Sequence, residues 1–434
     1  MDFFESYNRI KEQTQDLSQY SLDELEDILR HAELAYREYD NLQLVTKRNC
    51  NSLYGSTGNE HFQFCDVDIA EDITTICRHF AILVDIAINK YFASWHNNEE
   101  ALTKIRTFYP DTISLDNMRY VKDSVDDVCI YGDTDSRYID LGKIMNLIVS
   151  PNGHRQLPPN TPEGNEELAD FSVFLDKEFL QDIITTAINE DLDYRGGNKG
   201  FLKMAHEVTT RKSVLLSKKM YIMPLIWKDG KKMLDKPKMK YMGVSIKRGE
   251  TSPQLKKIIE KLVYRFLVEE YTESQISKEC NKIVQMLKLK NQKSIVCRST
   301  SVSGVSELQL VKDEDGKSHY EMPKKHIQAQ LIENWANFLL ENGMDKEYKL
   351  AFEKQKMYYY KTLGSKYKVI GIPDDVDIDK VPNLPPIDWH QMINQQFIKP
   401  LMKCLFDFGG GKKDITDEQC NNFLTGVFVN KIKV

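Results

Sequence analysis

Two acidic residues in one short segment are the clearest indication of chemistry in this sequence. Asp133 and Asp135 stand two residues apart in Tyr-Gly-Asp-Thr-Asp-Ser, between apolar residues that favour strands. Hard divalent cations such as Mg²⁺ take oxygen ligands, and a two-metal site for nucleotidyl transfer needs carboxylates that bridge ions about 4 Å apart. The pattern predicts a strand–turn–strand over residues 126–141 with both carboxylates at its tip. The alternative is a solvated turn made of ordinary turn residues.

A second segment could bind a nucleotide. In Lys-Arg-Asn-Cys-Asn-Ser-Leu-Tyr-Gly, the side chains of Lys47, Asn51 and Tyr54 share one face of a helix. A lysine can meet a triphosphate as a point charge, and an amide offers both donors and acceptors. The tyrosine ring offers a flat surface to a base or sugar, and Gly55 leaves room for close approach. The alternative is a surface lysine near a helix end.

The elements that position these segments follow from periodicity and turn residues. Ser21 followed by Glu24 is a capping box, and it opens a helical pattern over residues 21–60 that predicts two helices. The other predicted elements are helices over 66–95 and 171–192, a surface loop over 150–166, a hairpin over 218–232, and a helix-rich region after Pro253 that ends in one last helix.

The composition excludes several classes of protein. With 434 residues, 41% hydrophobic and 29% charged, the chain can bury a sizeable core and is not disordered throughout. No apolar run reaches the roughly 18 residues that a membrane span needs, and the acidic, polar N-terminus is unlike a secretory signal. The eight scattered cysteines form no CxxC pair, which argues against a zinc knuckle or a disulfide framework and fits a cytoplasmic location.

Charge is distributed unevenly along the chain. The net charge is -6, but residues 203–262 contain 16 Lys and Arg against 5 Asp and Glu, whereas residues 1–60 contain 6 against 12. A local excess of this kind can hold a polyanion along one track of an otherwise acidic protein.

Together the two chemical segments resemble a definite pattern. Lys-x-x-x-Asn-Ser-x-Tyr-Gly followed downstream by Tyr-Gly-Asp-Thr-Asp-Ser is typical of family B DNA polymerases, and the resemblance is greatest to those of T-even-type phages. It extends along nearly the whole chain, through less specific segments: Gly58-Asn59, Ile73-Thr74-Thr75, Ser217-Lys218-Lys219-Met220-Tyr221, Lys238-Met239-Lys240-Tyr241-Met242-Gly243, His326-Ile327 and Phe397-Ile398-Lys399-Pro400-Leu401.

This resemblance implies an α+β fold with a right-hand architecture. The expected parts are helical fingers over residues 1–57, an antiparallel-sheet palm with the catalytic hairpin over 58–243, and a mostly helical thumb with a C-terminal tail over 244–434. It also implies a DNA-directed DNA polymerase that transfers a nucleotide from a dNTP to a primer 3'-OH with two Mg²⁺ ions.

The resemblance assigns roles to the residues of the two segments. Asp133 and Asp135 would be the catalytic, metal-binding carboxylates, with Asp135 the more direct ligand. Lys47 and Asn51 would contact the incoming triphosphate, and Tyr54, followed by Gly55, would lie against the minor-groove side of the new base pair.

Contacts to DNA are implied further along the chain. Lys218 and Tyr221 would touch the primer terminus, and a basic track would neutralise backbone phosphates without reading sequence. The members of this basic track are Lys218, Lys219, Lys238, Lys240, Lys247 and Arg248. The alternative is a lysine-rich solvated surface. Glu207 is either an acidic accessory residue near the active site or a Glu on a helix surface or in an ion pair. For Arg9 and Lys11, a solvated helix face is favoured over phosphate contacts.

The sequence departs from the family pattern in ways that matter. It has no Asp-x-x-Ser-Leu-Tyr-Pro-Ser segment, whose Asp is the other main metal ligand, and the 46 residues before Lys47 leave no room for an exonuclease domain. Met220 replaces an Arg, and Arg137 follows Ser136 where the family is usually apolar. We therefore expect the C-terminal portion of a polymerase, from a split gene or as a truncated fragment, which does not polymerise alone and exposes apolar faces.

The expected partners are primer–template DNA, dNTPs and an N-terminal polymerase/exonuclease chain, in the host cytoplasm if the protein is phage-encoded, with no membrane. A sliding clamp could bind the tail at residues 423–428, although a packed terminal helix is favoured there. The competing hypothesis is a catalytically inactive DNA-binding remnant or accessory subunit, and an adjacent reading frame that carries the missing segments would argue against it.

Overall fold

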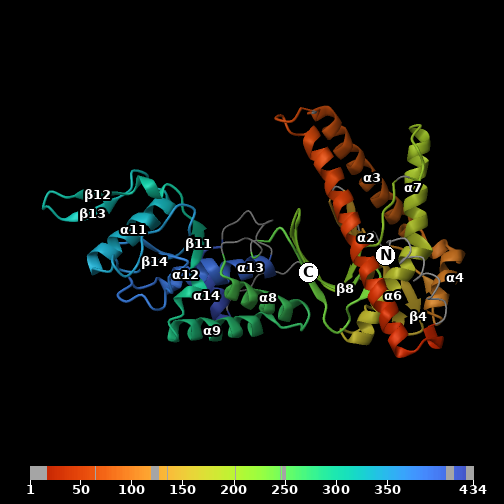
Figure 1. Ribbon diagram of the computed structural model, residues 1–434. Coiled ribbons are helices and arrows are strands. Elements are labelled where there is room, and N and C mark those ends of the chain that lie inside the picture. The colour runs from red at the N-terminus through yellow and green to blue at the C-terminus, as the bar shows by residue number, and fades with distance from the viewer. Residues whose placement is uncertain are drawn as a thin grey trace. The chain divides into compact units, whose positions relative to one another are not determined.

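The structure is a computed structural model that describes residues 17–63, 65–118, 127–133, 135–200, 202–244, 246, 251–406 and 415–426 (Figure 1). The predicted contacts of Lys247, Arg248, Arg9 and Lys11 lie outside these residues. The chain divides into two compact units. Unit 1 contains residues 1–94, 118–140 and 183–203, and unit 2 contains residues 95–117, 141–182 and 204–434. Helices and antiparallel sheets are mixed, as an α+β fold requires.

Unit 1 is built on two long helices. The helix α2 (Leu22–Thr57) begins at the predicted capping box, where the Ser21 amide donates to Glu24 Oε2 at 2.8 Å. The prediction of two helices over 21–60 is wrong, because α2 runs without a break through 36 residues. No proline stands between Leu22 and Thr57, and Gly55 comes only in the last turn, so nothing interrupts the hydrogen-bond ladder.

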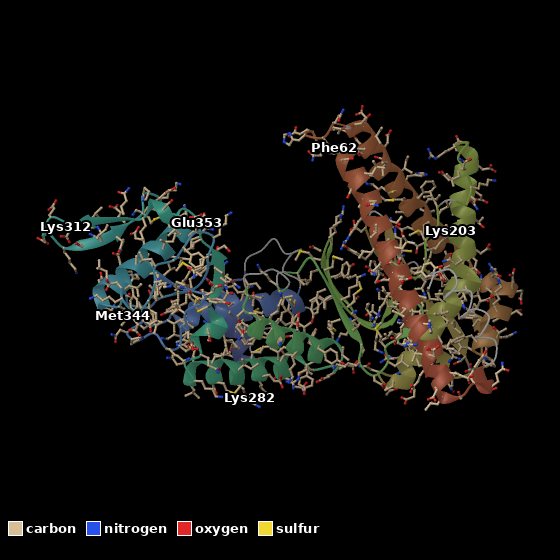
Figure 2. The ribbon with its side chains drawn as sticks, in the orientation of Figure 1. Phe62, Lys203, Lys282, Lys312, Met344 and Glu353 are labelled. Atoms are coloured by element: carbon tan, nitrogen blue, oxygen red, sulfur yellow. The ribbon has the colours of Figure 1, made fainter. Side chains whose placement is uncertain are left out.

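The second long helix, α3 (Val67–Ala93), confirms the prediction for residues 66–95. Its N-cap is Asp66, whose carboxylate accepts from the Ile69 amide at 3.2 Å. It packs against α2, and Figure 1 shows the two running side by side, while Phe62 in Figure 2 marks the turn that joins them.

A short hairpin in unit 1 carries the predicted carboxylates at its tip. Strands β2 (Cys129–Asp133) and β3 (Ser136–Ile139) pair in antiparallel fashion, which confirms the predicted strand–turn–strand. Both strands pack against α3. From residue 183 onward, α7 (Gln181–Tyr194) also belongs to this unit, and its Asp191 carboxylate lies 3.0 Å from His79 Nε2 of α3.

Unit 2 is organised around the long strand β8 (Met220–Lys228). It pairs with β6 (Val208–Thr210), β7 (Val214–Ser217), β9 (Lys231–Lys232) and β10 (Lys238–Met242) in one antiparallel sheet. The predicted hairpin over 218–232 is confirmed. Its turn residues Asp229 and Gly230 both have positive φ, as a two-residue Asp-Gly hairpin turn requires.

One sequence prediction for unit 2 needs correction. Residues 150–166 are only partly loop, because β4 (Ile148–Ser150) and β5 (Gly153–His154) pair there and α6 (Pro162–Leu175) already begins. The proline taken as a loop residue is Pro162 at the first helical position, where its missing N–H is not needed. The region after Pro253 is rich in helices as predicted, and it also contains two small antiparallel sheets.

The C-terminal part of unit 2 has one continuous core, which contains the fully buried rings of Trp335, Tyr360, Phe397, Phe406 and Phe423. The terminal helix α14 (Asp417–Thr425) is present as predicted and packs on α9 (Glu273–Leu289), where the Ser277 hydroxyl donates to the Phe423 carbonyl oxygen at 2.7 Å. The tail beyond residue 426 lies outside the described residues.

The remaining described elements of unit 2 are η2 (Trp95–Asn97), α4 (Glu99–Phe108), β1 (Ser114–Leu115), α5 (Leu141–Asn146), a π-helix (Asp176–Leu180), α8 (Pro253–Leu267), α10 (Lys293–Val296), β11 (Arg298–Ser301), η5 (Val305–Glu307), β12 (Gln309–Lys312), β13 (Ser318–Glu321), α11 (Ile327–Asn342), β14 (Lys356–Lys361), β15 (Val369–Pro373), α12 (Trp389–Ile393), a second π-helix (Asn394–Ile398) and α13 (Lys399–Leu405). All eight cysteines are free thiols. Over the part of the chain that the structure describes, no helix is long and apolar enough to cross a membrane.

Candidate functional site

The two predicted carboxylates lie at the tip of the β2–β3 hairpin. Asp133 is the last residue of β2, is half-buried and pairs with Ser136, the first residue of β3. Asp135 lies in the connecting turn and is exposed. The hairpin therefore presents acidic residues at the place where the sequence pattern predicted them.

The hairpin is held by a row of α3 residues that the sequence interpretation missed. Ala81, Asp85 and Asn89 are spaced four residues apart, so they follow one side of α3. The Asn89 Oδ1 atom accepts from the Val128 amide at 3.0 Å, just before β2 begins. The Ala81 carbonyl oxygen accepts from Arg137 Nε at 3.0 Å, and Asp85 Oδ1 lies 2.6 Å from the same nitrogen. The four-residue spacing of these α3 residues and the unusual arginine at position 137 were the sequence features that could have indicated a contact between the hairpin and α3.

The layer between the hairpin and α3 is partly buried, with 11% of the Arg137 side chain and 32% of the Asp85 side chain exposed. Burial raises the pKa of Asp85, although the positive charge of Arg137 and a hydrogen bond with the Cys129 thiol act in the opposite direction. Burial, together with the charge of Asp85, raises the pKa of Cys129 to about 12. The thiol is therefore protonated at neutral pH and serves as a hydrogen-bond partner within the fold.

The predicted nucleotide face lies on the C-terminal half of α2. Lys47, Asn51 and Tyr54 all belong to this one helix, at positions that share a face, and all three are exposed. A Cβ atom built on Gly55 would meet no atom within 4 Å, so the space beside this glycine is open. The face and the hairpin lie in the same unit, and the elements that carry them both pack against α3.

The basic track belongs to unit 2. Lys218 and Lys219 are exposed in the turn between β7 and β8, and the exposed Lys238 and half-buried Lys240 lie on β10, which pairs with β8. Two residues apart on a strand, Lys238 and Lys240 point to the same face of the sheet. The structure therefore brings two basic segments that are distant in sequence onto one sheet.

Tyr221, which was predicted to touch the primer terminus, is only 7% exposed. The Lys240 ammonium group lies 5.6 Å from the centre of its ring, a cation–π arrangement. At this point of the surface, Lys240 rather than the Tyr221 ring is accessible to a ligand.

Glu207 lies at the opposite end of β8 from Tyr221. It precedes β6, and its carbonyl oxygen accepts from the Asp229 amide at 3.2 Å. Val208 pairs with Lys228, so Glu207 lies beside Asp229, eight residues along the chain from Tyr221, or roughly 26 Å at about 3.3 Å per residue. The side chain is exposed and does not lie on a helix.

Comparison with known proteins supplies the decisive observation. The sequence model described as DNA polymerase family B matches residues 28–148, which include both Lys47 and the hairpin acids. The DNA-directed DNA polymerase of Escherichia phage RB69 is 24% identical over 274 residues, which cover 61% of this chain and 26% of that protein. The DNA-directed DNA polymerase of Enterobacteria phage T4 is 23% identical over 262 residues, which cover 58% and 25%.

This chain is related to the family B DNA polymerases. The T4 and RB69 matches agree with the resemblance to T-even-type phage enzymes. The chain spans about a quarter of the length of the curated relatives it matches.

Family B DNA polymerases generally use divalent metals, and the hairpin fits that requirement in part. Asp133 and Asp135 supply carboxylate oxygens, the ligand type that Mg²⁺ prefers. Within residues 17–426, outside the gaps given above, no group of three or more His, Cys, Asp or Glu side chains could hold a metal ion. The described residues thus offer two carboxylates rather than a complete site.

Proposed function

We propose that this chain is part of a DNA-directed DNA polymerase that adds nucleotides from dNTPs to a primer 3'-OH. The observation that carries the proposal is that the family match over residues 28–148 contains the hairpin acids and the Lys47 face together, in one compact unit. Simple DNA binding requires neither carboxylates nor a triphosphate-binding face.

The chain's own residues would have distinct tasks. Asp133 and Asp135 would hold the catalytic metal, which would supply charge stabilisation and Lewis acidity at the primer hydroxyl. Lys47 neutralises the triphosphate, Asn51 fixes its orientation, and Tyr54 covers the base pair. Because these groups are already held on a hairpin and a helix, positioning and electrostatics supply much of the rate.

The basic track would hold the primer–template. Lys218, Lys219, Lys238 and Lys240 contact phosphates, which suits an enzyme that must accept any sequence. The alternative of a lysine-rich solvated surface predicts no dependence of DNA affinity on these residues.

We further propose that a polypeptide outside this sequence completes the metal site. Its Asp-x-x-Ser-Leu-Tyr-Pro-Ser segment would supply the missing carboxylate, because the described residues offer two. The apolar side chains that α2 and α3 expose support such a partner, since soluble surfaces rarely present large contiguous apolar patches. These exposed side chains are Leu22, Leu29, Leu34, Tyr36, Tyr39, Leu42, Leu44, Val45, Leu53, Val67, Ile69, Ile73, Ile76, Ile82 and Ile86.

Primer extension tests this proposal. The chain alone should not extend a primer in Mg²⁺, whereas a mixture with the N-terminal polymerase/exonuclease polypeptide of an adjacent reading frame should. Asp135→Asn in the mixture should abolish extension and leave primer–template binding nearly unchanged. Robust extension by the chain alone would refute the need for a partner, and full activity of the Asp135→Asn mixture would refute the role of the carboxylate.

Nucleotide binding gives a test that does not depend on turnover. A fluorophore attached at Cys50, which is exposed on α2 three residues after Lys47, would report dNTP binding. Lys47→Ala should weaken this signal, while Arg48→Ala, the exposed neighbour that points away from the Lys47 face, should not. Equal effects of the two substitutions would exclude a specific triphosphate contact.

The second candidate is a DNA-binding remnant without turnover. The partial metal site favours it, because a remnant needs no third carboxylate. It predicts salt-dependent DNA binding through the basic track and no extension with any N-terminal polypeptide.

A further inference from the structure

We propose that Arg137 is a positioning residue that fixes the tip of the β2–β3 hairpin, and with it the carboxylates of Asp133 and Asp135, to α3. This inference rests on the proposed metal-binding function of those two residues. The sequence pattern marked Arg137 only as a departure from the family.

The Arg137 guanidinium joins both sides of the hairpin tip to the helix. Its Nη1 donates to the Asp133 carbonyl oxygen at 2.9 Å and to the Ser136 carbonyl oxygen at 2.8 Å, so it binds the two residues that flank the turn. Its Nε donates to the Ala81 carbonyl oxygen at 3.0 Å. One side chain therefore bridges the backbone of the turn and the backbone of α3.

A buried charge needs compensation, and Asp85 provides it. The Arg137 side chain is 11% exposed, and its Nε lies 2.6 Å from Asp85 Oδ1. Because the Nε hydrogen points at Ala81, this approach is an electrostatic contact rather than a second hydrogen bond. With 11% of its side chain exposed and with Nε and Nη1 bonded within the protein, Arg137 is less suited to contact DNA phosphates than an exposed arginine.

The absence of a side chain at Gly132 leaves the space that the Arg137 side chain occupies across the hairpin. The two residues are cross-strand partners, and a Cβ on Gly132 would overlap Arg137 Nη1 and lie 2.7 Å from Cζ. Any side chain at position 132 would therefore displace the guanidinium. The glycine of the Tyr-Gly-Asp-Thr-Asp-Ser segment is therefore needed in this chain to make room for the Arg137 guanidinium, a close approach of the kind that glycine in a strand often marks.

Arginine suits this position better than lysine. Its planar fork carries five donors, and the contacts to α3 and to the turn use two different nitrogens of that fork. A lysine ammonium group would have to reach both from a single nitrogen. Arg137→Lys should therefore behave like Arg137→Ala in the tests below, although it keeps the charge.

A double-mutant cycle tests the contact in the full chain without any activity. Amide hydrogen exchange of peptides from residues 127–140 is measured for wild type, Arg137→Ala, Gly132→Ala and the double variant. Each single substitution should speed exchange about tenfold or more, because a charged hydrogen-bond network is broken. The double variant should match Arg137→Ala alone, since the clash no longer exists.

The matched control is Arg78→Ala, which removes an exposed arginine from the same helix and should leave exchange unchanged. Wild-type exchange in Arg137→Ala would overturn the proposal. So would additive effects in the cycle, because Gly132 would then act independently of Arg137.

Mn²⁺ binding separates positioning from mere stabilisation. Electron paramagnetic resonance titration of the full chain should show Mn²⁺ binding to the two carboxylates, weaker than at a completed site, that Asp135→Asn removes and that Arg137→Ala lowers about 10- to 100-fold, as loss of outer-shell support does. Arg78→Ala should bind Mn²⁺ like wild type. A loosened hairpin with unchanged Mn²⁺ affinity would overturn the positioning role. Mn²⁺ binding insensitive to Asp135→Asn would count against the proposed function instead, and the exchange cycle would still show whether Arg137 holds the hairpin.

Discussion

The backbone carbonyl oxygen of Lys219 lies where a Cβ on Gly243 would have to stand. Gly243 has a φ of 65°, in the left-handed region that favours glycine. The turn that carries Lys218 and Lys219 is thereby packed directly against the end of β10. Two segments of the predicted basic track depend on a residue that has no side chain.

Gly243→Ala should destabilise unit 2 more than a left-handed alanine alone would. The φ value costs about 1 kcal/mol, and the new Cβ would also lie 2.9 Å from Met220 Cγ besides overlapping the carbonyl oxygen. The matched control is Gly230→Ala, where φ is 83° but nothing lies within 4 Å. Urea unfolding of both variants isolates the effect of close approach, and equal losses of unfolding free energy would contradict it.

Removing a lysine of the basic track should change the salt dependence of DNA binding. Lys238→Ala and Lys240→Ala should each lower the slope of log K against log salt by about 1 and weaken binding to every duplex alike. Fluorescence anisotropy with a labelled primer–template at several NaCl concentrations measures the slope. Lys282→Ala on α9 (Figure 2) is the control and should leave it unchanged. Slopes that match wild type would favour the solvated-surface alternative.

Acid should weaken unit 2 through His206. Its ring stacks on Trp227 at 4.1 Å, and Nε2 lies 2.8 Å from the Thr209 hydroxyl. Burial lowers the pKa of His206 below 6.5, although the charge of Asp176 acts in the opposite direction. The unfolded chain therefore binds the proton more readily, and stability is lost as the pH falls below about 6.5.

His206→Phe should remove this part of the acid sensitivity while keeping an aromatic ring on Trp227. Urea unfolding at about pH 7.5 and about pH 5.5 gives the comparison, and wild type should lose more unfolding free energy than the variant. The same loss in both proteins would show that His206 is not the group responsible.

A charge on the exposed apolar face of α2 should leave the fold intact and weaken the binding of apolar molecules to that face. Leu29 is 60% exposed, so Leu29→Lys should change the unfolding free energy by less than about 0.5 kcal/mol. It should lower the binding of an apolar dye and the association with the N-terminal polypeptide. Ala35→Lys, at the buried position of the same helix, should instead destabilise unit 1. A large loss of stability in Leu29→Lys would mean that the face is already covered within the chain.

The sequence predicted local features of unit 1 well. The capping box at Ser21, the start of α3 at Asp66 and the acidic hairpin tip all depend on neighbours a few residues apart, and all are confirmed. The division of residues 21–60 into two helices failed because no helix breaker separates the two apolar patterns, so the backbone continues through both.

Features that depend on distant partners could not be predicted. The four-residue spacing of Ala81, Asp85 and Asn89 follows one side of α3, but it does not indicate that Arg137 meets that side, since the contact depends on how the hairpin packs against the helix. The burial of Tyr221 depends on β10 lying beside β8 and on Lys240 covering the ring. The fingers, palm and thumb boundaries remain predictions, as do the roles of the site residues.

The unbroken course of α2 has a mechanical consequence. With 36 residues the helix is about 54 Å long, and along this length Ala35 is its buried residue. Because few of its side chains are buried, the helix can move as a rigid body. A tilt of about 10° around one end displaces the other end by about 9 Å. A small rearrangement near Leu22 would therefore carry the lysine-bearing end through a distance comparable to the size of a nucleotide.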